Sequence, residues 1–135
     1  MKTINHVILF VFLLLLGSCT SISKFSISPI TPAAEGTVKI THDKNKNFLI
    51  DVNVKYLADA TRLTPPSNVY VVWMANDRGI SINLGMLVSN SKNNASLRAV
   101  TSSKPFQIFV TAENVGDTDS PGNQEIFHTS YLTIK

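Results

Sequence analysis

The stretch FLIDVNVKY, residues 48–56, decides the fold of this chain. Every second position carries an apolar or aromatic side chain: Phe48, Ile50, Val52, Val54 and Tyr56. A period of two places these side chains on one face of an extended strand and is typical of a strand with one buried face. The polar loop 43–47 precedes the stretch, and Val38 and Ile40 alternate with polar residues before that loop, so the two segments predict a β-hairpin.

Similar strand patterns recur along the rest of the chain. Residues 69–75 are nearly all apolar, which predicts a central strand buried on both faces. Alternation returns over residues 80–88, where Gly85 interrupts it and indicates a β-bulge or a close backbone approach. Shorter patterns predict strands over residues 95–100, 106–112 and 126–134. Residues 114–124 form a long polar loop, and we expect Glu113 to accept hydrogen bonds from its amides.

About seven strands between turns, without long helical periodicity, predict an all-β fold: a small antiparallel β-sandwich, Ig-like in the loose sense. We assign this domain to residues 37–135. The sequence holds one cysteine, so an internal disulfide is excluded, and we expect Trp73 at the centre of the core. Tyr70 lies three residues before Trp73, so the two side chains are expected on opposite faces of one strand.

The N-terminal region predicts export rather than a membrane span. Residues 7–16 form an unbroken apolar run, VILFVFLLLL, which follows the basic Lys2. A helix that spans a bilayer needs about 20 apolar residues, so this run is too short to cross. It fits the apolar centre of a secretory signal peptide instead.

The residues at the end of that run, LGSC at 16–19, resemble the bacterial lipobox, in which the cysteine thiol receives diacylglycerol. Cys19 is therefore the expected lipidation site, and residues 1–18 are the expected lipoprotein signal peptide. A plain secretory cleavage site with a chance cysteine is the alternative. Residues 19–36 are rich in Ser, Thr, Pro and Ala and predict an acylated, flexible tether, with an edge strand that begins around Phe25 and Ile27 as an open alternative for part of it. Thr20 favours the outer membrane, because aspartate at that place resembles an inner-membrane retention signal in enteric bacteria.

Composition limits the classes of function. A chain of 135 residues has room for one domain and excludes a two-domain enzyme. The formal net charge is +3, from 12 lysine and arginine residues against 9 aspartate and glutamate residues, and no two basic residues are adjacent. The sequence therefore lacks the basic cluster that nucleic-acid binding requires. The expected first partner is the membrane, which the protein reaches through its lipid.

Patterns for catalysis are weak, and we assign no catalytic, cofactor-binding or metal-binding residue. The segment GISIN, residues 79–83, departs from the Gly-x-Ser-x-Gly nucleophile elbow at its last position. His42 and His128 are the histidines of the expected mature chain. A triad of either with Asp117 or Asp119 is an open alternative that no pattern favours.

A calcium site is a second open alternative. The run DTDSPG, residues 117–122, resembles the start of a calcium loop. An EF-hand loop requires an oxygen ligand at its fifth position and glutamate at its twelfth, where this chain has proline and histidine. A looser site would use Asp117, Asp119 and Glu125, whereas a solvated loop is the simpler interpretation.

Six short motifs follow one another in the second half of the chain: LTPP at 63–66, YVVW at 70–73, NLGML at 83–87, PFQI at 105–108, VTAE at 110–113 and SPG at 120–122. In order and spacing they resemble the C-terminal extracytoplasmic domain of anti-sigma-K factors. The resemblance implies a fold and an extracytoplasmic location, and no catalytic residue. Members of that family also carry a cytoplasmic helical domain that holds the sigma factor and a transmembrane helix. We expect neither here, so the resemblance does not extend to sigma-factor regulation.

Three classes of function follow from these patterns. The first is a membrane-anchored, non-enzymatic envelope lipoprotein that binds another envelope protein or supports a complex, which an exposed apolar patch would favour. The second is a module that binds glycan or cell-wall fragments, which outward aromatics such as Phe109 and Tyr56 would favour. The third, a small hydrolase, would need His42 or His128 in a cleft beside serine and aspartate.

Overall fold

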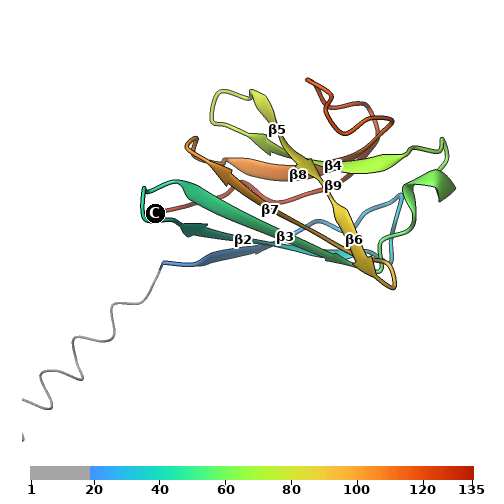
Figure 1. Cartoon of the computed structure of the whole chain (residues 1–135), viewed down its shortest axis with the longest axis horizontal. Coiled ribbons are helices and arrows are strands. Elements are labelled where there is room, and N and C mark those ends of the chain that lie inside the picture. The colour runs from blue at the N-terminus through green and yellow to red at the C-terminus, as the bar shows by residue number, and fades with distance from the viewer. Residues whose placement is uncertain (1–18) are drawn as a thin grey trace, which may run out of the picture.

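The structure is a computed structural model that describes residues 19–135, so the expected signal peptide, residues 1–18, lies outside the described residues. Two antiparallel sheets pack face to face in the described part of the chain (Figure 1). The predicted all-β antiparallel sandwich is therefore confirmed. Residues 19–135 contain nine strands, where the sequence predicted about seven.

Both sheets combine strands that lie far apart in the sequence. In spatial order, the first sheet consists of β1 Ser21–Lys24, β2 Glu35–His42, β3 Phe48–Lys55, β7 Asn94–Thr101 and β6 Val88–Ser91. The second sheet consists of β5 Ser81–Met86, β4 Val69–Ala75, β8 Gln107–Glu113 and β9 Glu125–His128. A 3-10 helix, η2 Ala60–Arg62, lies in the connection between β3 and β4.

The strands β2 and β3 form the predicted hairpin, with Val38 opposite Val52 and Ile40 opposite Ile50. All four side chains are at most 2% exposed and belong to the core between the sheets. The second sheet contributes the facing half of this core: Tyr70, Val72, Met74, Ile108, Val110, Ile126 and Phe127. Fully burying a side chain of this size contributes about 1.5–3 kcal/mol, so this core is the main source of stability.

The chain passes from the second sheet to the first between β5 and β6. Gly85 lies just before this crossing with a φ of +126°, a conformation that favours glycine. The register shifts there, because Val72 pairs with Gly85 whereas Trp73 pairs with Asn83. The expected bulge at Gly85 is thus confirmed, and the single strand expected over residues 80–88 divides into β5 and β6.

Two expectations about strand ends are wrong. Tyr56 does not share the buried face of Ile50, because the chain leaves β3 after Lys55 and Tyr56 takes a φ of +57° with an exposed side chain. The last strand, expected over residues 126–134, ends at His128. Beyond that point the chain makes separate backbone hydrogen bonds with residues at the start of β8.

The expected flexible tether, residues 19–36, instead contains β1, which pairs with β2 along its whole length. Phe25 then packs on Phe127 with ring centroids 4.5 Å apart, and Ser28 is fully buried. The prediction of a tether is therefore wrong over most of this segment. Its composition was misleading because an edge strand needs few apolar residues when its backbone pairs with a neighbour.

The buried hairpin residue Ile50 provides a test of the core. Ile50→Ala removes a side chain with no exposed surface and should lower the free energy of unfolding by about 2–5 kcal/mol. Ile22→Ala, on the exposed face of the edge strand β1, is the control and should change it by less than about 1 kcal/mol. Equilibrium urea unfolding measures both quantities, and equal losses would contradict the placement of Ile50.

Candidate functional site

Trp73 lies outside the core between the sheets, on the opposite side of β4. Val72 and Met74 belong to the core, whereas Val71 and Trp73 point the other way, to what we call the outer face of the second sheet. Trp73 and Val71 are nonetheless 0% exposed. The expectation that Trp73 centres the core is therefore wrong, while the prediction that Tyr70 and Trp73 occupy opposite faces is confirmed.

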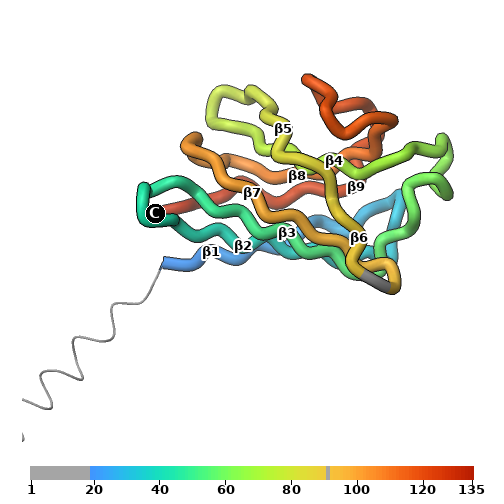
Figure 2. Tube along the Cα trace, viewed as in Figure 1, coloured from blue at the N-terminus to red at the C-terminus, as the bar shows by residue number. Residues whose placement is uncertain are grey.

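The loop 114–124, which we call the braced loop, lies over this outer face. It connects β8 to β9, and Figure 2 shows it rising above these strands on the side away from the first sheet. Phe109, which lies opposite Trp73 on β8, stacks on the indole with centroids 6.3 Å apart and planes 15° apart. A second, smaller apolar layer therefore forms outside the sandwich.

A series of hydrogen bonds joins the indole to the braced loop. The Trp73 Nε1–H donates to Thr111 Oγ1 at 2.8 Å, and the Thr111 hydroxyl donates to Glu113 Oε1 at 2.5 Å. The same Glu113 oxygen accepts the backbone N–H of Gly122 at 2.7 Å. A Cβ at residue 122 would lie 2.9 Å from Glu113 Oε2, so glycine permits this approach. The prediction that Glu113 accepts from loop amides is confirmed.

Asn83 holds the braced loop from the other side. It lies opposite Trp73 on β5, and its Nδ2 donates to the carbonyl oxygens of Gly116 and Thr118, each at 2.9 Å. Its Oδ1 accepts the backbone N–H of Gly85 at 2.8 Å, so the β-bulge orients the amide. The braced loop is therefore attached on both sides of Trp73, to β5 and to β8.

The braced loop presents a mixed apolar and acidic surface to solvent. Val115 is 57% exposed, and Met86 of β5, against which Gly116 packs, is exposed as well. Asp117 and Asp119 of the same loop are exposed. Binding residues are commonly carried on loops that a well-packed scaffold positions. We therefore take Met86, Val115, Asp117 and Asp119, which we call the loop surface, as the candidate functional site.

The structure does not bring together the calcium ligands considered from the sequence. Asp117 and Asp119 are exposed in the braced loop, whereas Glu125 pairs with His128, with Oε1 2.6 Å from Nδ1. Within residues 19–135, no group of three histidine, cysteine, aspartate or glutamate side chains is placed to hold a metal ion. Asp117 and Asp119 are thus charges of the loop surface.

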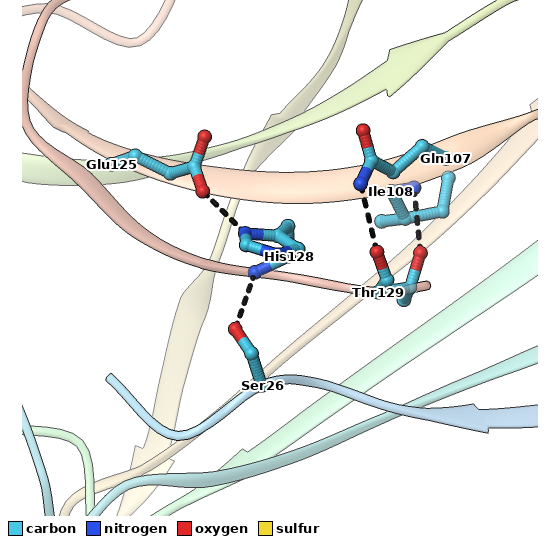
Figure 3. Close-up of polar contacts among 6 residues, drawn as sticks. All are labelled: Ser26, Gln107, Ile108, Glu125, His128 and Thr129. Carbon is cyan, nitrogen blue, oxygen red and sulfur yellow. Dashed lines mark hydrogen bonds and ion pairs between the residues drawn. The ribbon is translucent and has the colours of Figure 1, made fainter. Parts of the chain in front are cut away.

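His128 contacts Ser26 through its backbone N–H and not through its imidazole ring (Figure 3). Ser26 Oγ accepts the backbone N–H of His128 at 3.2 Å, whereas the imidazole faces Glu125. The next residue, Thr129, is buried and bonded to β8: its Oγ1 accepts a backbone N–H at 3.1 Å and its carbonyl oxygen accepts Gln107 Nε2 at 2.8 Å. These bonds secure the chain after β9.

The other residues considered for catalysis lie on different elements. His42 ends β2, and its ring centroid is 4.8 Å from that of Phe48. Ser81 begins β5 opposite Ala75. The structure therefore places His42, Ser81 and His128 on three separate strands.

Cys19, the expected lipidation site, is exposed, and Thr20 alone separates it from β1. It lines a small pocket with His42, Ile134 and Lys135, at the end of the sandwich where the C-terminal residues also lie (Figure 1). The thiol is therefore accessible at the start of the described chain. Among residues 19–135, none of the helices has the length and apolar character needed to cross a membrane.

A groove of about 490 Å³ lies at the same end of the sandwich. Its lining includes Arg78 from the turn after β4, Lys104 and Phe106 before β8, and Ile134. Phe106 stacks on Tyr131, which is 70% exposed, with ring centroids 4.7 Å apart. Of the two aromatics named from the sequence, Tyr56 is exposed, as expected for glycan binding, whereas Phe109 is half-buried against Trp73.

Comparison with known proteins assigns no family: no family model matches the chain, and no curated protein matches it. The resemblance to anti-sigma-K factors therefore depends on the six motifs quoted from the sequence. The structure brings residues of four of those motifs together around the braced loop: Trp73, Asn83, Glu113 and Gly122.

Sequence reasoning missed two residues of this site, Thr111 and Asn83. Thr111 lies on the same face of β8 as Phe109, and its side chain is buried, so its hydroxyl needs a hydrogen-bond partner. Asn83 lies two residues before the bulge glycine, where its side chain bonds the backbone. The side chain of Asn83 reaches a loop that follows three strands later in the chain, and the burial of Thr111 is visible only in the structure.

The Glu113 carboxylate should keep the braced loop over Trp73, because its loss leaves the Thr111 hydroxyl and the Gly122 amide without their acceptor. Trp73 is the only tryptophan of the chain, so its emission reports on the loop. Glu113→Ala should shift that emission to longer wavelength and increase its quenching by acrylamide. Glu125→Ala removes an exposed carboxylate from the same face and should change neither; identical spectra for the two variants would disprove the role of Glu113.

Proposed function

We propose that this protein is a lipoprotein of the bacterial cell envelope, held at a membrane by acyl chains on Cys19. It acts without catalysis, as an interaction module that binds a partner protein through the loop surface. The observation that carries the proposal is that the exposed Cys19 lies at one end of the sandwich, next to the first sheet, whereas the braced loop covers the outer face of the second sheet (Figure 2). Attachment at Cys19 therefore leaves the loop surface free.

The anchor is supported by the sequence around Cys19 and by the exposure of its thiol. An apolar run at 7–16 followed by LGSC has the order that lipoprotein export requires. Each acyl methylene buried in a bilayer contributes about 0.8 kcal/mol, so several chains attach a protein firmly. Thr20 after the cysteine favours the outer membrane.

The directions of the strands support the proposed orientation of the domain relative to a membrane at Cys19. β1 starts beside Cys19, where Ser21 lies opposite Ile40 near the end of β2. β8 starts from that same end, since a short connection joins it to the end of β7, where Thr101 lies opposite Phe48. β8 then runs away from that end and leads into the braced loop (Figure 1). A membrane at Cys19 would thus lie at the end of the sandwich, whereas the loop surface would face away from the outer side of the second sheet.

The chemistry of the loop surface favours a protein partner. Exposed Val115 and Met86 offer apolar contact area, and Asp117 and Asp119 add negative charge that selects a partner with basic groups. The loop is ordered beforehand because it accepts hydrogen bonds from Asn83 and donates one to Glu113, which lowers the entropy cost of binding. The resemblance to the outer domain of anti-sigma-K factors agrees with an extracytoplasmic interaction module.

A second candidate function is the binding of glycan or cell-wall fragments. The observation that favours it is the stacked pair of Phe106 and Tyr131 beside the groove. Apolar faces of sugar rings can stack on such aromatics while polar groups bind the hydroxyls. Tyr131→Ala should then weaken binding to soluble cell-wall fragments, and an unchanged affinity would exclude this function at the groove.

The proposed anchor has a direct test. Cys19→Ala should abolish incorporation of labelled palmitate, because it removes the thiol that forms the thioether. Thr20→Ala, a change at the next residue that keeps the thiol, should still incorporate the label. Labelling of the Cys19→Ala protein at the level of the unmodified sequence would refute acylation at this residue.

Partner binding is tested with the acylated protein purified from detergent-solubilised envelopes after cross-linking. Val115→Ser should reduce recovery of the cross-linked partner several-fold, because it removes exposed apolar area from the loop surface. Val100→Ser is the matched control, since Val100 is 56% exposed but lies on the first sheet. Equal recovery with both variants, or recovery no greater than with Cys19→Ala, would count against this partner site.

A further inference from the structure

The end of the sandwich that carries Cys19, which we call the anchor end, combines three connections with the C-terminal residues. The connections are residues 43–47 after β2, 76–80 after β4 and 102–106 after β7. Strand pairing places them together, because His42 lies opposite Phe48 and Ala75 lies opposite Gln107. Figure 1 shows the C-terminus at the same end.

The anchor end is basic. In the described part of the chain it carries five exposed cationic side chains: Lys44, Lys46, Arg78, Lys104 and Lys135. The carboxylate side chains of the same segments are Asp43 and Asp77. Cationic side chains therefore outnumber anionic side chains at the end of the domain that carries Cys19.

Asp43 has a structural role that explains its place in this basic group. Its Oδ2 accepts the Asn47 Nδ2–H at 3.0 Å, and its Oδ1 accepts the backbone N–H groups of Asn47 and Asn45 at 2.9 and 2.8 Å. These hydrogen bonds lower the pKa of the Asp43 carboxyl, and the bond from the Asn47 side chain has the largest effect. The carboxylate thus shapes the turn that presents Lys44 and Lys46 to solvent.

The opposite end is close to balanced in charge. Three carboxylates lie on the segments there: Glu35, Asp59 and Glu113. The cationic side chains at that end are Lys24, Lys55, Arg62 and Lys92. Charge is therefore distributed unevenly along the sandwich, with the positive end at Cys19.

Apolar and aromatic side chains are exposed among the cations of the anchor end. Ile80 projects from the turn after β4, and Phe106 and Tyr131 form the stacked pair beside the groove that Arg78 and Lys104 line. Basic residues mixed with aromatic and aliphatic ones are typical of surfaces that meet lipid headgroups.

From these observations we infer that the anchor end rests on anionic phospholipid headgroups, so that the domain stands on the membrane. The inference rests on the proposed acylation of Cys19. With β1 starting at Ser21, Thr20 is the remaining spacer, and an extended residue spans at most about 3.6 Å. So short a spacer holds the anchor end beside the bilayer, and an anionic surface attracts cations within about one Debye length, which is about 10 Å at 0.1 M salt.

Lysine reactivity measures this contact one residue at a time. The acylated protein is placed in vesicles of phosphatidylcholine alone or with phosphatidylglycerol, treated with an amine-reactive ester and mapped by mass spectrometry. Lys44 and Lys104 should react several-fold more slowly in the anionic vesicles than in the neutral ones. Lys24 and Lys55, at the opposite end, are the internal controls and should react equally in both.

Salt and charge variants separate the possible outcomes. High salt should restore the reactivity of Lys44 and Lys104, because it screens the attraction. A variant with Arg78→Glu and Lys135→Glu should remain acylated yet lose most of the protection, whereas Lys24→Glu with Arg62→Glu should keep it. Equal reactivity at both ends in both vesicles would overturn the inference, and a Cys19 peptide without lipid mass would instead overturn the proposed anchor.

Discussion

A strand that is apolar on both faces must be covered on both sides, and β4 is such a strand. The core between the sheets covers Tyr70, Val72 and Met74, but Val71 and Trp73 remain on the outer face. Burying side chains of this size contributes about 1.5–3 kcal/mol each, so an uncovered outer face would lose much of the stability of a small domain. The braced loop supplies the missing cover from the same chain.

The hydrogen bonds of the site are a consequence of burying Trp73 beneath the braced loop. A buried indole N–H needs an acceptor, which Thr111 provides, and the Thr111 hydroxyl in turn donates to Glu113. On the other side the bulge at Gly85 shifts the register so that Asn83 lies opposite Trp73 and reaches the loop. The features that order the loop surface are thus those that satisfy hydrogen bonds around one buried ring. A loop ordered in this way is suited to binding, because little further ordering is required.

The two ends of the sandwich differ in charge and in covalent chemistry. The proposed acylation site and a surplus of exposed cations lie at one end, whereas the acidic loop surface lies over the outer face of the second sheet. The segment expected to be a flexible tether forms β1 instead. A domain joined so directly to a lipid anchor has few orientations at a membrane. A lipid-anchored interaction module with one end on the bilayer and the outer face of its second sheet toward a partner is consistent with this arrangement.

The sequence by itself determined the all-β class, the hairpin of β2 and β3, the central strand β4, the bulge at Gly85 and the acceptor role of Glu113. These features depend on side-chain period and on local turn chemistry, which residues close in the chain decide. It did not determine the face that Trp73 occupies, the pairing of β1, or the meeting of Asn83 with the loop. Only the tertiary structure decided these, because period-two alternation shows that a strand has two faces without showing which face meets the other sheet and which meets a distant loop.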